Sequence, residues 1–158
     1  MVHIVTGSVN SGKTTKLLLL YKELKTGDGF ILPKVYTDGT YIGQQVVRLS
    51  TGAGIPFTFK EGYIPAYWNE KYRYDIYSFS REGFDYVFNI ADDIIQNNIS
   101  PAFIDEIGPL ELQGKGFSEI LSQFLLLNST IYISVRETLL KSVIERFNIK
   151  SYDLIKVS

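Results

Sequence analysis

The chain is poor in the residues that build disulfide frameworks and metal cages. Its 158 residues include no cysteine and one histidine, His3. This composition excludes a disulfide scaffold and a site made of thiolate metal ligands. Because His3 lies inside an expected strand, 2–6, we expect it to have a structural role.

The chain also lacks long hydrophobic runs and an excess of charge of one sign. Its longest apolar runs, 17–21 and 124–127, are far shorter than the roughly twenty residues of a membrane-spanning helix. The net charge is −1 and the lysines and arginines are scattered, so we expect no membrane association and no basic face for nucleic acid. Met1 is followed directly by the expected strand, without the basic segment of a secretory signal, so we expect a cytoplasmic protein.

The length and composition suit one globular domain. Hydrophobic residues make up 45% of the chain, which is typical of a protein with a packed core. A chain of this length can bury a sizeable core but is too short for two ordinary domains, so we expect a single domain over residues 1–158.

The most informative segment is a glycine-rich loop at residues 7–14. Its sequence, Gly-Ser-Val-Asn-Ser-Gly-Lys-Thr, matches the pattern G-x-x-x-x-G-K-[ST] between an expected strand, 2–6, and an expected helix, 15–24. Gly7 and Gly12 allow the backbone to approach a phosphate closely. Backbone N–H groups of the loop and of the first helical turn then form an anion-binding nest. We therefore predict that this loop binds the phosphates of a nucleoside triphosphate.

The side chains of the loop have distinct expected roles. Lys13 supplies positive charge to the β- and γ-phosphates, and Thr14 offers its hydroxyl to Mg²⁺, an ion that takes few protein ligands. Thr15 is placed to reach the α-phosphate. The predicted phosphate-binding residues of the loop are Gly7, Ser8, Val9, Asn10, Ser11, Gly12, Lys13, Thr14 and Thr15.

An acidic pair at the end of an apolar strand is the second group of candidate site residues. Asp105 and Glu106 close the expected strand 102–105, and we predict that Asp105 holds Mg²⁺ through a water. Glu106 is expected to act as the base that orients or deprotonates the attacking water. The segment also fits the pattern D-x-x-G, in which the N–H of Gly108 binds the γ-phosphate. The charge of Mg²⁺ and of Lys13 would offset the repulsion between two adjacent carboxylates.

The second half of the chain alternates between helices and strands. We expect helices at 84–97, 116–127 and 137–147, and strands at 102–105, 130–135 and 152–157. This alternation predicts parallel strands joined by crossovers, with helices on both faces of the sheet. In such sheets the ligand binds at the carboxyl ends of the strands, where both the loop and Asp105 are expected to lie.

An antiparallel hairpin is expected near residues 30–49. Two β-rich runs, 30–36 and 41–49, flank an Asp-Gly turn within 37–40, and a further short strand is expected at 56–60. The fold class is therefore α/β: a three-layer P-loop NTPase fold with a mixed, mainly parallel sheet.

More than half of the aromatic residues fall within 57–88. One interpretation is a surface for bases or a partner, and the other is an irregular region packed by its own rings. We favour the second, with one or two rings available to stack on the nucleotide base.

Charge that develops on a γ-phosphate usually requires a further cation, such as an arginine. Arg136 follows the expected strand 130–135, so it lies at the same edge of the sheet as the loop and is the first candidate. Arg81, at the start of an expected helix, is the second.

These motifs together resemble the small P-loop nucleoside-triphosphatase family over nearly the whole chain. The specific parts are the phosphate loop, the Gly29-Phe30 hairpin and the segment 104–111, Ile-Asp-Glu-Ile-Gly-Pro-Leu-Glu. The resemblance implies slow, Mg²⁺-dependent hydrolysis of ATP, GTP, CTP and UTP to nucleoside diphosphate and phosphate.

Glu111 matches the second glutamate of the family pattern, and a salt bridge or a cap is as plausible for it as catalysis. The family tends to carry a basic residue after the Gly-Phe pair, where residues 31–34 read Ile-Leu-Pro-Lys.

Three other classes of protein share a phosphate loop. A nucleotide or small-molecule kinase, the main alternative, needs an acceptor site and usually an arginine-rich lid, which the five scattered arginines do not predict. A binding module with little turnover often loses the base or the lysine, and this chain has both. A signalling GTPase carries an N-K-x-D motif, which is absent. We therefore expect a hydrolase of broad base specificity; the sequence identifies no protein partner.

Overall fold

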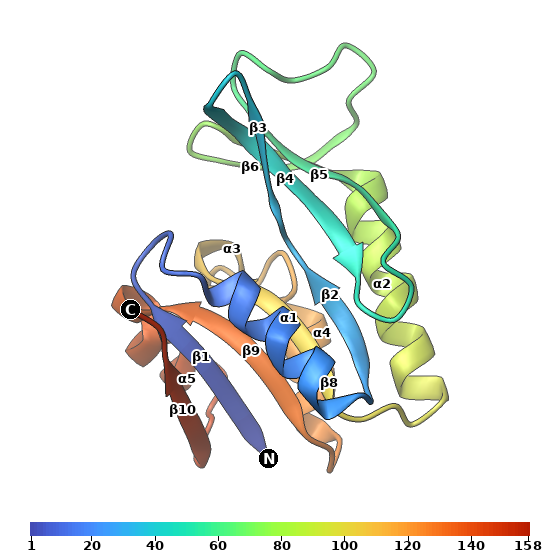
Figure 1. Ribbon diagram of the computed structural model, residues 1–158, viewed down its shortest axis with the longest axis vertical. Coiled ribbons are helices and arrows are strands. Elements are labelled where there is room, and N and C mark those ends of the chain that lie inside the picture. Colours follow the sequence, from blue (N-terminus) through green and yellow to red (C-terminus); the bar gives the residue numbers. More distant parts are fainter.

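A computed structural model describes all 158 residues, and its centre is one ten-stranded mixed sheet (Figure 1). The strand order is β10-β1-β9-β8-β2-β4-β5-β7-β6, with β3 paired to β4. The strands are β1 (Val2–Gly7), β2 (Asp28–Ile31), β3 (Lys34–Thr37), β4 (Thr40–Arg48), β5 (Gly54–Lys60), β6 (Glu70–Tyr74), β7 (Tyr77–Ser80), β8 (Ala102–Ile107), β9 (Ile131–Arg136) and β10 (Tyr152–Lys156). The helices are α1 (Lys13–Leu24), α2 (Arg81–Gln96), α3 (Pro109–Leu112), α4 (Ser118–Leu126) and α5 (Leu140–Arg146), with a 3₁₀ turn at Glu137–Leu139.

Five strands, β10, β1, β9, β8 and β2, form the parallel half of the sheet. They are joined through helices, as the alternating pattern predicted. Because they are parallel, their carboxyl ends meet at one edge. Gly7 ends β1 and Arg136 ends β9, and these two residues are paired in the sheet.

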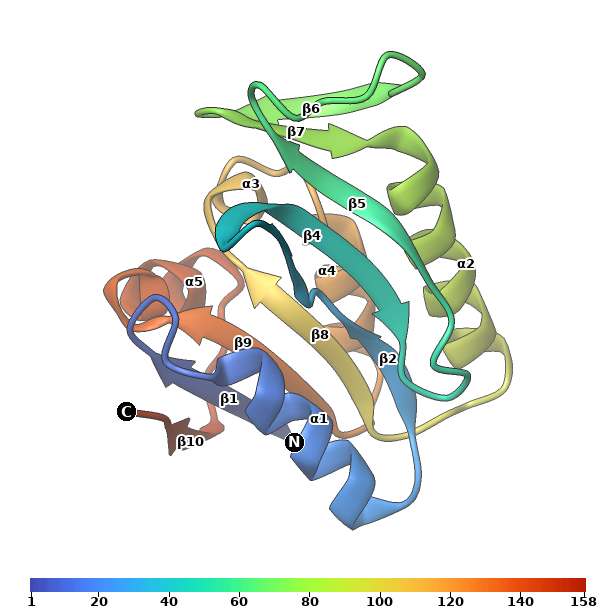
Figure 2. The ribbon, with the colours of Figure 1, turned by 45° about the horizontal axis from the view of Figure 1, so that its top comes forward.

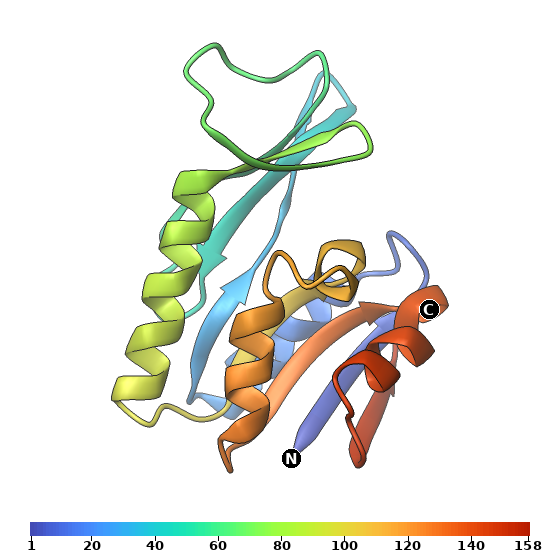
Figure 3. The same ribbon diagram turned by 180° about the vertical axis from the view of Figure 1, so that it is seen from behind.

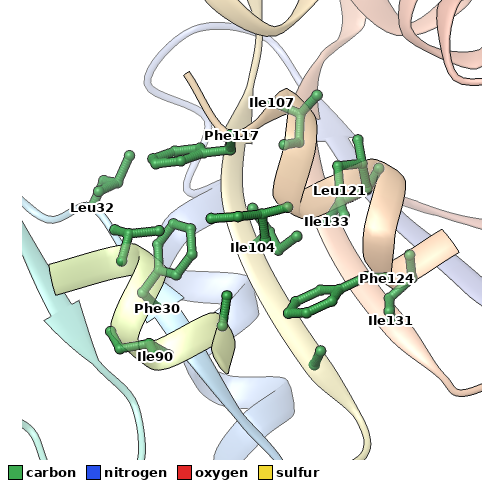
Figure 4. Packing of buried hydrophobic residues seen from close by; sticks show 14 of the residues in the cluster. Phe30, Leu32, Ile90, Ile104, Ile107, Phe117, Leu121, Phe124, Ile131 and Ile133 are labelled. Carbon is green, nitrogen blue, oxygen red and sulfur yellow. The ribbon is translucent and has the colours of Figure 1, made fainter. Parts of the chain in front are cut away.

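Helices cover both faces of this half, which gives the expected three layers. Helix α1 lies on one face, and α2, α4 and α5 lie on the other (Figures 1 and 3). Successive strand residues point to opposite faces. Phe103 therefore packs in the cluster that contains Leu17 of α1, whereas Ile104 packs with Phe30 and Phe124 on the other face (Figure 4).

Strand β2 is the junction between the two halves of the sheet. It pairs parallel with β8 on one side and antiparallel with β4 on the other. The expected strand 30–36 is divided here, because Pro33 has no N–H and the N–H of Leu32 donates to Asp105 at 2.9 Å instead of to a neighbouring strand. Beyond the break, the predicted hairpin is confirmed as β3 and β4, and Asp38 and Gly39 both have positive φ in its turn.

The region 57–88 contains more regular structure than expected. Strands β6 and β7 form a second antiparallel hairpin, which Figure 2 shows at the outer end of the sheet. Strand β6 lacks a buried face, so its sequence has no clear alternation. The packing of rings is confirmed: Phe57 contacts Phe79, Phe84 and Phe117.

Helix boundaries differ slightly from those expected. Helix α2 begins three residues before the expected 84–97, because the Ser80 hydroxyl accepts the N–H of Gly83 at 3.0 Å and caps the helix. The expected helix 137–147 is a 3₁₀ turn followed by α5. None of the helices combines the length and apolar character that crossing a membrane would require.

We predict that the buried ion pair at the β2–β4 junction is a main source of stability. Asp28 is 2% exposed, and Arg48 donates to it from Nη2 at 2.8 Å and from Nε at 2.9 Å. Arg48→Ala leaves this carboxylate buried without its cation, so we expect the free energy of unfolding to fall by about 3–5 kcal/mol. Urea unfolding measures the change.

The control is Arg73→Ala, which breaks a half-exposed pair with Glu70 and should cost about 1 kcal/mol or less. Equal losses in the two variants would contradict the prediction.

Candidate active site

The phosphate loop joins the carboxyl end of β1 to the start of α1. Asn10 and Gly12 have φ values of 62° and 91°, so the backbone turns tightly between them. A side chain at Gly7 would collide with the carbonyl oxygen of Val157, which explains why only glycine fits at the end of β1. The predicted strand–loop–helix arrangement is therefore present.

The side chain of Lys13 closes over the loop. Its Nζ donates to the carbonyl oxygen of Ser8 at 2.6 Å and lies 3.5 Å from Oγ of Ser11. Partial burial lowers the pKa of Lys13, as do the charges of Arg136 and Lys34, whereas nearby carboxylates raise it. Both oxygens that contact Nζ are uncharged, so a phosphate would give the ammonium group an anionic partner.

Asp105 connects three elements around the site. Its side chain is fully buried. Its Oδ2 accepts from the hydroxyl of Thr14 at 2.7 Å and from the N–H of Leu32 at 2.9 Å, and its Oδ1 accepts from the hydroxyl of Ser134 at 2.5 Å. The two residues predicted to hold a metal, Thr14 and Asp105, are thus brought together.

Glu106 is redirected by a bulge in β8. Ile104 pairs with Ile133 and Ile107 with Val135, so two residues of β8, Asp105 and Glu106, lie opposite one residue of β9, Ser134. Glu106 has a φ of 55°, and its N–H donates to the hydroxyl of Ser134 at 2.7 Å. Bulges of this kind turn a side chain out of the regular alternation.

Gln44 of β4 holds the carboxylate of Glu106. Its amide nitrogen donates to Oε2 of Glu106 at 2.5 Å, and Gln44 itself is buried. The sequence offered no signal for this residue, because it reaches the site only through the pairing of β4 with β2.

The surroundings of Glu106 favour a protonated carboxyl. Its side chain opens into a cavity, but protein atoms replace much of its hydration. This desolvation, and the charge of Asp105, raise the pKa of Glu106 well above its ordinary value, against the hydrogen bond from Gln44. A carboxylate with a raised pKa is suited to accept a proton near neutral pH.

The cavity that Glu106 faces gathers the cations of the site. Its volume is about 630 Å³, and Lys13, Lys34 and Arg136 all line it. Arg136 lies at the edge of the sheet where it was predicted, and the one basic residue of the segment 31–34, Lys34, also lines the cavity. Arg81, the second candidate, does not line the cavity.

Glu111 stabilises the turn after β8. Its Oε1 accepts the N–H of Gly108 at 2.7 Å and its Oε2 accepts the N–H of Phe117 at 2.8 Å. The role left open for Glu111 is thus a cap of α3. Gly108 lines the cavity, and its N–H, predicted to bind the γ-phosphate, donates to Glu111 in this structure; its contact with phosphate stays a prediction.

We predict that Glu111 makes stability depend on pH. Burial raises its pKa from 4.5 to about 7, so the folded state retains a proton that the unfolded chain releases. The stability that Glu111 contributes should be fully present below pH 4.5 and be lost as the pH rises through about 7, by about 3 kcal/mol.

Urea unfolding of the wild type and of Glu111→Gln between pH 4.5 and 8 tests this. Other groups titrate in both proteins, so the difference between them isolates Glu111. A difference that does not change with pH would refute the assignment.

Comparisons with known proteins agree with this fold and indicate a family. A family model described as NTPase matches residues 2–158. The nucleoside-triphosphatase THEP1 of Archaeoglobus fulgidus is 29% identical over 155 residues, which cover 94% of this chain and 87% of the relative.

Two solved structures share the fold. The crystal structure of THEP1 from the hyperthermophile Aquifex aeolicus has a TM-score of 0.77 at 20% identity, covering 100% of this chain and 90% of that chain. The solution structure of a human cancer-related nucleoside triphosphatase has a TM-score of 0.66 at 24% identity, covering 99% and 88%. They confirm the P-loop fold class, and the family model, which spans almost the whole sequence, shows that this chain belongs to the NTPase family.

Proposed function

We propose that this NTPase hydrolyses nucleoside triphosphates to nucleoside diphosphate and phosphate, with Mg²⁺ and with broad base specificity. Membership of the family supports the reaction class. The observation that carries the mechanism is the position of Glu106: it is held by Gln44 and faces the cavity that Lys13 and Arg136 also line. A base and two cations thus surround one space at the end of the phosphate loop.

The residues present fit a magnesium ion. The hydroxyl of Thr14 and the carboxylate of Asp105 lie 2.7 Å apart, and both are the oxygen ligands that Mg²⁺ prefers. No group of three or more acidic, histidine or cysteine side chains gathers as a metal cage. This agrees with an ion that is held mainly by phosphates and waters, with Thr14 and Asp105 completing its shell. When bound, the ion would neutralise charge on the phosphates.

Each residue of the site has a defined task in hydrolysis. Lys13 exchanges the carbonyl oxygen of Ser8 for a phosphate oxygen, and the loop N–H groups bind the remaining oxygens. Glu106 accepts a proton from the water that attacks the γ-phosphorus. Arg136 and Lys34 stabilise the charge of the transition state, and this electrostatic stabilisation contributes most to the rate in reactions of this kind.

Broad base specificity follows from what the loop contacts. The loop binds phosphates, which all four nucleotides share. The N-K-x-D motif that would select guanine is absent from the chain. We therefore expect ATP, GTP, CTP and UTP all to be hydrolysed.

We predict that Glu106→Gln abolishes turnover but retains nucleotide binding. The amide keeps the size of the side chain but cannot accept a proton, so kcat should fall by about 10²–10⁴-fold. Phosphate release with Mg²⁺ and each of the four nucleotides gives kcat, and titration of a nucleotide gives Kd. Glu119→Gln, an exposed substitution on α4, is the matched control and should behave as the wild type.

Two outcomes would overturn this proposal. Normal phosphate release by Glu106→Gln would remove Glu106 as the base. Release from GTP alone would contradict the broad specificity while leaving the hydrolysis intact.

We predict that Arg136→Ala lowers kcat by about 100-fold with little change in KM. The guanidinium has no partner among the hydrogen bonds and ion pairs of the structure, and its contact with phosphate should strengthen in the transition state. Arg81→Ala, outside the cavity, is the control. Steady-state kinetics with MgATP compares Arg136→Ala with Arg81→Ala. Equal kcat values for the two variants would remove Arg136 from the mechanism.

A further inference from the structure

The cavity in front of Glu106 is larger than hydrolysis requires. Its volume of about 630 Å³ lies in the range of about 300–1,000 Å³ typical of small-molecule sites, whereas a water molecule occupies about 30 Å³. Of the phosphate loop, only Val9, Asn10 and Lys13 line it. Most of its wall therefore belongs to other elements and extends away from the loop.

Aromatic rings of the antiparallel half form much of that wall. Tyr36, Tyr41 and Tyr77 make a row, with ring centroids 5.9 Å and 6.1 Å apart. The buried rings of Phe57 and Phe117, stacked at 5.7 Å, line the cavity as well. Figure 2 shows β4 and β7, the strands that carry Tyr41 and Tyr77, beside and above the carboxyl end of β8. A ring surface of this kind suits the face of a planar molecule.

A few polar groups interrupt the aromatic wall. Thr58 lines the cavity, and its buried hydroxyl has no hydrogen-bond partner in the protein. Asp75 and Lys34 line it too, and Nζ of Lys34 lies 5.7 Å from the ring centroid of Tyr41. Mostly apolar walls with a small number of polar groups are the usual composition of a small-molecule site.

We infer that this cavity binds a small alcohol that carries a planar ring, and that the protein transfers the γ-phosphoryl group of the bound nucleotide to the hydroxyl of that alcohol. The inference rests on the nucleotide site proposed above. It adds an acceptor to that site, because any hydroxyl held at Glu106 occupies the place of the attacking water.

The transfer uses the same groups as hydrolysis. The hydroxyl oxygen of the alcohol forms a bond to the γ-phosphorus, and the bond from that phosphorus to the bridging oxygen of the β-phosphate breaks. Glu106 accepts the hydroxyl proton, and the nucleoside diphosphate leaves with the bridging electron pair. The products are a phosphate monoester and a nucleoside diphosphate.

A kinase needs a site for the acceptor of the phosphoryl group, and the cavity meets this requirement. The cavity offers an acceptor space, and residues of strands β3 to β7 line it. The ring row is separate from the phosphate-binding groups, so substitutions there can alter the acceptor without removing Lys13 or Glu106.

The test incubates the full chain and MgATP with uridine, adenosine or pyridoxine, and with glycerol as an alcohol without a ring. Mass spectrometry quantifies ADP, phosphate and the phosphate monoester. We expect at least one ring alcohol to yield a monoester and to lower the ratio of phosphate to ADP, and glycerol to yield none.

Variants connect the transfer to the ring row. Tyr77→Ala should lower the ratio of monoester to phosphate by about tenfold, the size expected for one lost stacking contact. Tyr36→Ala, at a ring that is 58% exposed and hence tolerant of truncation, should lower the same ratio. Tyr63→Ala, at a half-exposed ring outside the cavity, is the control and should not change it.

Equal amounts of ADP and phosphate with every ring alcohol, and no monoester, would overturn the inference and leave the hydrolase intact. A monoester whose yield is unaffected by Tyr77→Ala and Tyr36→Ala would also overturn it, because the acceptor would then bind elsewhere. If no ADP forms with or without an alcohol, the proposed hydrolysis itself fails.

Discussion

The site depends on one buried carboxylate, that of Asp105. It accepts hydrogen bonds from Thr14 at the start of α1, from the backbone of Leu32 after β2, and from Ser134 in β9. A buried charge is tolerated only when its hydrogen bonds are satisfied, so these three elements are held at fixed distances around it. The same carboxylate lies near the carboxyl end of β8, which pairs with β9 on one side and with β2 on the other. A single group therefore joins the start of α1, the end of β2 and β9 around the proposed site.

The mixed sheet explains why the base and the phosphate loop face a common space. The parallel half brings the ends of β1, β8 and β9 to one edge, as in other α/β proteins. At β2 the sheet changes to antiparallel, and the interruption at Pro33 lets β3 and β4 continue past that edge. Gln44 of β4 then reaches Glu106, and the aromatic rings of the same half complete the cavity. The antiparallel half thus acts as the wall of the site as well as part of the fold.

The features that could be predicted from the sequence are those formed by residues close together in the chain. The loop 7–14 and the pair Asp105-Glu106 carry their chemistry in contiguous residues, and the alternation of strands and helices places them at one edge. Gln44 could not be predicted, because its contact depends on a strand register set by distant segments. The hairpin of β6 and β7 was missed because β6 has no buried residue and the buried residues of β7, Ser78 and Ser80, are polar, so neither strand has a hydrophobic period. The bond from the N–H of Gly108 to Glu111, three residues later, could not be predicted either, because a salt bridge or a cap was equally plausible for Glu111.

The most direct test of the proposed site is a crystal structure with Mg²⁺ and a non-hydrolysable triphosphate. We expect the γ-phosphate to contact Nζ of Lys13, and Thr14 and Asp105 to face the ion. A water should lie within about 3 Å of the Glu106 carboxylate, in line with the γ-phosphorus. A γ-phosphate directed away from the cavity, with no water between the γ-phosphorus and the Glu106 carboxylate, would contradict the proposed mechanism.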